Sequence, residues 1–92
     1  MKKSILSNER ACYWCKTTQD LHRHHIFFGR NRKASDQHGC WCYLCGKHHN
    51  LSNEGVHFNR EMDLILRKEC QQAFEELYSH EKFMEVFKVN YL

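Results

Sequence analysis

Two short pairs of metal-binding residues constrain this chain more than any other feature. One pair is Cys12-x-x-Cys15, and the other is Cys45-x-x-His48. This spacing is typical of the turns that surround a tetrahedral zinc ion. A chain of 92 residues buries little apolar surface, and domains of this size commonly need disulfides or a metal. We therefore predict one structural Zn²⁺ bound by Cys12, Cys15, Cys45 and His48.

The start of the chain and its hydropathy favour zinc over disulfides. No apolar stretch follows the basic start Met-Lys-Lys, and no run of about 18 apolar residues predicts a membrane span. We expect a cytoplasmic protein with no membrane partner, whose thiols stay reduced and free to bind metal. Cys40 and Cys42 occupy alternate positions of a predicted strand, so they face the same way and should line the core, unless one of them replaces Cys45 or His48 as a zinc ligand. Cys70 is interpreted as a packing residue.

Histidines are the second unusual feature, with eight in the chain. His24 and His25 are adjacent, and His49 directly follows the predicted zinc ligand His48. Histidine serves as a metal ligand or as a general base at physiological pH. Adjacent residues of a strand point to opposite faces, so one histidine can hold a metal while its neighbour lies near a substrate atom. His57 is interpreted either as a further ligand of that metal or as a surface histidine.

Charge is distributed unevenly over a formal net charge of +3. Residues 1–33 carry eight Lys or Arg against two acidic residues, whereas residues 34–92 carry six against nine. A basic half beside a histidine cluster suits a polyanion such as a nucleic-acid backbone, although a solvated basic surface would give the same composition. The predicted nucleic-acid contacts are Arg23, Arg30, Arg32 and Lys33.

Hydrophobic patterning predicts an α+β fold in one domain, residues 1–92. It comprises a zinc-stapled hairpin-and-helix core over residues 12–60 and a helical extension over 61–92. The predicted elements are a strand over 22–28, a loop over 29–36, an antiparallel strand over 39–44 and a helix over 45–52. Asn59 is the expected N-cap of a helix that runs to about Tyr78. Ser79 is the expected N-cap of a last short helix whose inward face carries Phe83, Met84 and Phe87.

The order Cys-x-x-Cys, His-His-Ile, Cys-x-x-His-His-Asn within residues 12–60 resembles the HNH endonuclease family, which has the ββα-metal fold. It is most similar to the small phage and prophage members with a structural zinc. The resemblance implies that His25 is the general base and that His24 and His49 bind a catalytic divalent ion. It also implies a bacterial or phage-infected cell. The counterpart of the family's middle Asn stays open between Asn31, Gln37 and His38.

These observations together predict a metal-dependent endonuclease that hydrolyses phosphodiester bonds in DNA. The resemblance implies 5′-phosphate and 3′-hydroxyl products. An imidazole-rich site should accept Mn²⁺, Ni²⁺ or Zn²⁺ readily, and Mg²⁺ less well because Mg²⁺ prefers oxygen ligands. The C-terminal helices could mediate a homodimer. The alternative is a non-catalytic zinc-binding module, derived from the same scaffold, that binds nucleic acid or a protein.

Overall fold

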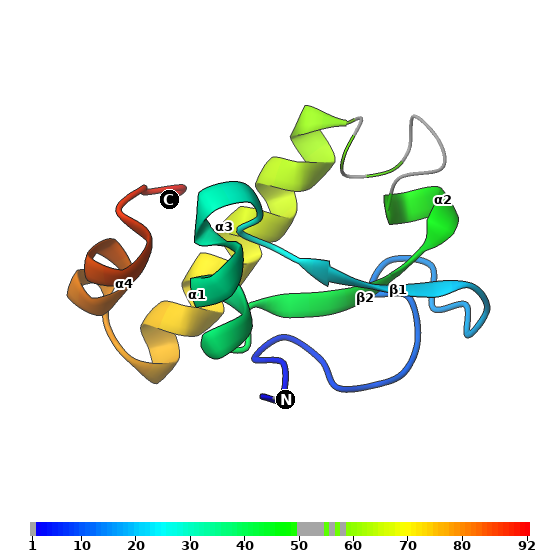
Figure 1. Ribbon diagram of the computed structural model, residues 1–92, viewed down its shortest axis with the longest axis horizontal. Coiled ribbons are helices and arrows are strands. Elements are labelled where there is room, and N and C mark those ends of the chain that lie inside the picture. The colour runs from blue at the N-terminus through cyan, green and yellow to red at the C-terminus, as the bar shows by residue number, and fades with distance from the viewer. Residues whose placement is uncertain (1, 50–54, 56, 58) are drawn as a thin grey trace.

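A two-stranded antiparallel sheet forms the centre of the molecule, with helices along its length (Figure 1). The computed structural model describes residues 2–49, 55, 57 and 59–92. The elements are β1 (Leu21–His25), the 3₁₀ turn η1 (Gly29–Asn31), α1 (Arg32–Gln37), β2 (Trp41–Cys45), α2 (Gly46–His49), α3 (Arg60–Leu77) and α4 (His80–Phe87). The helices α2 and α4 lie towards opposite ends of the long axis, and α3 crosses the molecule between them (Figure 1). The coarse α+β prediction is confirmed.

The register of the hairpin decides which side chains meet at its two ends. Leu21 is opposite Cys45, and His25 is opposite Trp41. The open end of the hairpin therefore brings the start of β1 next to the residue from which α2 begins. The backbone N–H of Gly46 donates to the carbonyl of Asp20 at 3.0 Å and closes this end.

The segment between the strands is helical where the sequence predicted a loop. Strand β1 ends at His25, not at residue 28, and residues 29–37 form η1 and α1. The reason is Ser35, a fully buried residue of α1. Its hydroxyl donates to the carbonyl of Cys40 at 2.5 Å and accepts the backbone N–H of Phe27 at 3.2 Å. The N–H of Phe27 is thus satisfied by a side chain and not by a partner strand, whereas the N–H of Ile26 still donates to the Cys40 carbonyl at 3.0 Å, and β2 begins at Trp41.

Capping residues set the starts of both C-terminal helices, as the sequence predicted. The side chain of Asn59 accepts the N–H of Met62 at 3.2 Å at the start of α3. The hydroxyl of Ser79 accepts the N–H of Lys82 at 3.0 Å at the start of α4. Each cap satisfies one of the N–H groups that a helix start leaves unpaired. The helix predicted over 45–52 begins at Gly46 and includes His49; the rest of the predicted range, residues 50–52, lies outside the described residues.

Helices α3 and α4 pack together, and aromatic side chains of α4 contact the segment that follows β1. The ring of Phe27 lies 4.5 Å from that of Phe87 and 5.4 Å from that of Phe83, measured between centroids. One buried cluster joins all these elements; its members are Cys12, Ile26, Phe27, Cys40, Cys42, Cys45, Leu44, Leu66, Cys70, Phe74, Phe83 and Phe87. The predicted core roles of Cys40, Cys42 and Cys70 are therefore confirmed.

Part of the apolar pattern of α3 faces outwards. The exposed fraction is 50% for Ile65 and 62% for Leu77, although both fit the helical spacing of the core positions. A homodimer through the C-terminal helices stays a prediction. No helix in the described part of the chain combines the length and apolar content that crossing a bilayer requires.

The two described glycines with positive φ provide a test of how the N-terminal segment packs against the rest of the protein. Gly39 has φ +72°, and a Cβ there would collide with the backbone carbonyl of Lys3, whereas Gly29 has φ +77° and open space around it. Alanine in the left-handed region costs about 1–2 kcal/mol at either site. We expect Gly39→Ala to lower the free energy of unfolding by a further ~1–3 kcal/mol, the usual cost of overpacking.

Chemical denaturation of both variants, with zinc present in excess, measures the difference. Gly29→Ala is the matched control, since it makes the same conformational change without the steric one. An equal loss of unfolding free energy in the two variants would contradict the packing of residues 2–6 against this turn.

Candidate metal centre and basic cavity

A tight turn presents the first two cysteines to one side of the hairpin. The backbone N–H of Lys16 donates to the carbonyl of Cys12 at 3.0 Å, and that of Cys12 donates to the carbonyl of Thr17 at 2.8 Å. Lys16 takes a left-handed conformation, with φ +65°, which reverses the chain after Cys15. The N–H of Tyr13 donates to the carbonyl of Tyr43 at 2.8 Å and holds this turn against β2.

The four predicted zinc ligands come together at the end of β2. The Sγ atoms of Cys15 and Cys45 are 3.7 Å apart, and Nδ1 of His48 lies 3.7 Å from Sγ of Cys12 and 3.2 Å from Sγ of Cys45. A tetrahedral zinc with Zn–S bonds near 2.3 Å separates two thiolates by about 3.8 Å. The donor set Cys₃His and its spacing thus fit a structural Zn²⁺. Cys40 and Cys42 are not part of this set.

Local hydrogen bonding distinguishes the thiol of Cys12 from those of the core. Burial would raise the pKa of Cys12, but the backbone N–H groups of Cys15 and Cys45 lower it from 9.0 to about 6. Burial raises the pKa of Cys42 to about 12 and that of Cys70 well above its ordinary value. Thiolate is the form that binds zinc. Cys12 is therefore predisposed to ligate a metal, while the core thiols stay protonated and apolar.

A second cluster consists of three histidines from three parts of the chain. A ring nitrogen of each of His24, His49 and His57 lies within 4.8 Å of the others. The Nε2 atoms of His49 and His57 are 3.1 Å apart. Two nitrogens bound to one ion at about 2.1 Å are separated by roughly 3.0–3.4 Å. His57, which the sequence left open between a ligand and a surface residue, thus lies where a third ligand would.

The environment of His24 and His49 favours the neutral imidazole, the form that binds metal. Burial, followed by the charges of His49 and His57, lowers the pKa of His24 from 6.5 to about 3. Burial and the neighbouring imidazoles of His57 and His22 lower the pKa of His49 to about 4. The Nε2 atom of His24 is buried and has no hydrogen-bond partner among the described residues. An unpaired buried nitrogen costs about 1–3 kcal/mol, and a bound cation would satisfy it.

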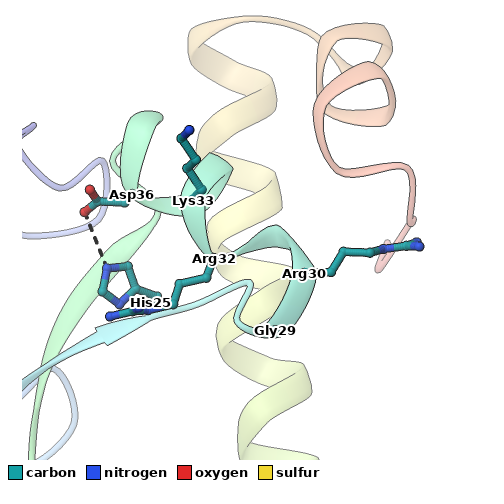
Figure 2. Close-up of a pocket in the computed structure, with 6 residues that line it drawn as sticks. All are labelled: His25, Gly29, Arg30, Arg32, Lys33 and Asp36. Atoms are coloured by element: carbon teal, nitrogen blue, oxygen red, sulfur yellow. Dashed lines mark ion pairs between the residues drawn. The ribbon is translucent and has the colours of Figure 1, made fainter.

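His25 lies beside this cluster and lines a basic cavity of about 430 Å³ (Figure 2). Arg32 extends alongside the His25 imidazole, whereas Arg30 and Lys33 point away from it (Figure 2). Burial, and then the charge of Arg32, lowers the pKa of His25. The imidazole is thus held in the neutral form that can accept a proton.

Asp36 is the carboxylate that faces His25, and sequence reasoning did not identify it. Its Oδ1 lies 3.4 Å from Nε2 of His25 (Figure 2). Two candidates for the middle Asn are engaged elsewhere: Asn31 donates to the carbonyl of Phe87 at 3.1 Å, and Nδ1 of His38 donates to that of Ala34 at 2.9 Å. The sequence did contain a clue to this role, because Asp36 is the one acidic residue between Asp20 and Glu54.

The four predicted nucleic-acid contacts fall into two groups. Arg30, Arg32 and Lys33 are exposed and line the basic cavity. Arg23 is partly buried instead; its guanidinium donates to Oδ1 of Asp36 at 2.7 Å and lies 4.4 Å from the centre of the Trp41 ring. The cations available to a polyanion at this cavity are therefore those of the segment that follows Gly29.

Sequence reasoning also missed a contact of His22, a residue that it assigned to no site. Its Nδ1 lies 2.9 Å from Nδ1 of His49, and its Nε2 lies 3.2 Å from Oδ1 of Asp20. The alternation of strand residues was a usable signal, because it places His22 and His24 on the same face of β1.

Comparison of this chain with protein-family models, with curated proteins and with solved structures finds no match.

The Cys₃His cluster predicts one tightly bound zinc per chain. Cys15→Ala should lose that zinc and much of the structure of residues 12–49, because metal binding in small domains is coupled to folding. Cys70→Ala is the matched control, since it removes a core thiol and should keep the metal. Elemental analysis together with circular dichroism measures both effects. Zinc retained in Cys15→Ala, or a Cys12–Cys15 disulfide in the purified protein, would contradict the assignment.

Proposed function

We propose that this protein is a metal-dependent endonuclease that hydrolyses phosphodiester bonds in DNA. One observation carries the proposal: a candidate base, three candidate metal ligands and two guanidinium groups line the same cavity of about 200 Å³. Those residues are Arg23, His24, His25, Arg32, His49 and His57, with Phe28 completing the wall. Phosphodiester hydrolysis needs an activated water, a Lewis acid and stabilisation of negative charge at one phosphorus atom.

His25 is the proposed general base. Its Nε2–H directed at Asp36 leaves the lone pair on Nδ1 free to accept a proton from water. Asp36 would fix this tautomer and the orientation of the ring, the role for which the sequence offered no clear residue. The water would give a proton to His25 and attack phosphorus, the bond to the 3′ oxygen would break, and that oxygen would take a proton from solvent, so the products would carry a 5′-phosphate and a 3′-hydroxyl.

His24, His49 and His57 are the proposed ligands of the catalytic divalent ion. When bound, such an ion supplies a Lewis acid for a phosphate oxygen and the leaving 3′ oxygen. Three imidazole ligands favour Mn²⁺, Ni²⁺ or Zn²⁺ over Mg²⁺. Three protein ligands also leave coordination positions open for substrate and water, as a catalytic site requires.

Arg32 is the cation placed to act at the scissile phosphate, because it lines both this cavity and the larger basic one. Arg30 and Lys33 line the larger cavity alone and would hold neighbouring phosphates. A planar guanidinium can donate two parallel hydrogen bonds to phosphate oxygens, which suits Arg32 to the charge that develops there.

The order of elements supports the ββα-metal interpretation. Strand β1 carries the candidate base and one ligand, β2 returns beside it, and α2 carries His49. The turn η1 and the helix α1 are inserted between the two strands, and they carry the basic side chains and Asp36.

Cleavage is the first expected property to test. His25→Ala should reduce the rate of plasmid nicking by about 10²–10⁴-fold, the usual contribution of a general base. Zinc content, unfolding midpoint and DNA affinity should stay close to wild type, since a base acts on the transition state more than on binding. Nicking is measured with added Mn²⁺, Ni²⁺ and Mg²⁺ in turn.

His38→Ala is the matched control for this variant, because it also replaces a partly buried histidine but one that lies outside the cavity. If His25→Ala nicked DNA as fast as His38→Ala, the assignment of His25 as the general base would be wrong. Wild-type protein that nicks no DNA with any of these ions would overturn the nuclease proposal in favour of a zinc-binding nucleic-acid module.

The basic cavity predicts salt-dependent DNA binding. Neutralising Arg30, Arg32 and Lys33 to glutamine should reduce the slope of log K against log salt by roughly 2–3, at about 0.9 for each phosphate that the protein no longer neutralises. Neutralising the exposed Lys2, Lys3 and Lys68 makes the same change in net charge elsewhere on the surface. Fluorescence anisotropy at several salt concentrations measures both slopes. Equal reductions in the two triple variants would move the DNA-binding surface away from the cavity.

A further inference from the structure

Both ring nitrogens of His49 face another imidazole, and the two contacts have different consequences. Its Nε2 lies 3.1 Å from Nε2 of His57, inside the three-histidine cluster. Its Nδ1 lies 2.9 Å from Nδ1 of His22, which is not a member of that cluster. The Nε2 of His22 in turn lies 3.2 Å from Oδ1 of Asp20. These contacts form a chain from a carboxylate, through two imidazoles, to the candidate metal site.

We propose that Asp20 and His22 are positioning residues that prepare His49 to bind the catalytic metal. The inference rests on the proposed function of the three-histidine cluster, and it adds two residues outside that cluster. We refer to the three side chains Asp20, His22 and His49 as the His49 relay.

Hydrogen-bond donors and acceptors in the relay are satisfied by one arrangement of neutral rings. The carboxylate of Asp20 only accepts, so Nε2–H of His22 donates to it. A neutral His22 then has its lone pair on Nδ1, which accepts Nδ1–H of His49. A neutral His49 consequently has its lone pair on Nε2, the nitrogen that faces the cluster. The relay thus selects the tautomer of His49 that can ligate a metal.

The backbone holds both ends of the relay in place. His22 lies in β1, paired with Leu44 of β2. The carbonyl of Asp20 accepts the N–H of Gly46, the first residue of α2, at 3.0 Å. Asp20 has a left-handed conformation, with φ +50°, which aspartate tolerates better than most residues. The same backbone bond therefore fixes the position of Asp20 and the start of the helix that carries His49.

Exposure of the relay decreases towards the metal site. The side chain of Asp20 is 62% exposed and that of His22 is 30% exposed, so the contact between His22 and Asp20 is exposed, whereas the contact between His22 and His49 is partly buried. The interaction of His22 with His49 is therefore the better shielded of the two bonds. Replacing a residue that orients a metal ligand commonly reduces metal affinity by about 10–100-fold.

Metal affinity tests the relay without depending on cleavage. Zinc-loaded protein is titrated with Co²⁺ in competition with a chromophoric chelator, and the visible spectrum of the bound Co²⁺ is recorded. His22→Phe keeps a ring but cannot accept the His49 hydrogen bond, so we expect Co²⁺ affinity to fall about 10–100-fold. His22→Asn places an amide oxygen near the position of Nδ1 and should restore affinity to within a few-fold of wild type. Asp20→Ala should cost less than about tenfold, because it leaves the bond to His49 in place.

His80→Phe is the matched control. Nδ1 of His80 lies 2.6 Å from a carboxylate oxygen of Glu75, so it is also a histidine paired with an acidic residue, but on α4 away from the cluster. This variant should bind Co²⁺ like wild type. Unfolding midpoints measured without added Co²⁺, together with zinc content, show whether any loss of affinity follows from a loss of structure.

Each outcome decides the inference. Wild-type affinity in His22→Phe would overturn the relay. An equal loss in His22→Asn and His22→Phe would also overturn it, and would indicate that His22 binds the ion directly. Wild-type protein that binds no Co²⁺ beyond its zinc would overturn the relay together with the three-histidine site. Normal relay behaviour without DNA nicking would instead leave the relay standing and reject only the nuclease activity.

Discussion

The junction between β2 and α2, from Cys45 to His49, is the element on which both candidate metal sites depend. Cys45 ends the strand opposite Leu21, and the N–H of Gly46 is held by the carbonyl of Asp20. Successive residues of a helix are rotated by about 100°, so His48 and His49 point in different directions. One joins the cysteine cluster, and the other joins the histidine cluster. A zinc ion on the first would thus fix the helical turn that orients a ligand of the second.

The six cysteines divide between two chemical environments that the fold keeps apart. Cys12, Cys15 and Cys45 lie at the open end of the hairpin, where backbone N–H groups favour the thiolate of Cys12. Cys40, Cys42 and Cys70 are buried in the core, where burial raises the pKa of Cys42 and Cys70. The same residue type therefore serves as a metal ligand in one place and as a small apolar side chain in the other.

Charge around His25 is balanced in a way that suits a polyanionic substrate. Asp36 occupies the centre, because its carboxylate contacts both His25 and the partly buried Arg23. That pairing neutralises the cation least accessible to solvent, and Arg30, Arg32 and Lys33 line the cavity with a net positive charge. Within the proposed function, one carboxylate would thus orient the base while the exposed cations hold phosphates.

Features that depend on local spacing could be predicted from the order of residues alone. Cys-x-x-Cys and Cys-x-x-His identified the zinc-type cluster, since residues three apart in a turn reach a common point, and Asn59 and Ser79 marked helix starts through bonds to residues three positions later. The helix α1 could not be predicted in this way, because it depends on a buried serine that bonds across a turn. The same holds for three side chains that lie beside partners distant in the sequence: Asp36, His22 and His57. Strand register and the docking of α2 set those distances, and neither follows from the composition of any single segment.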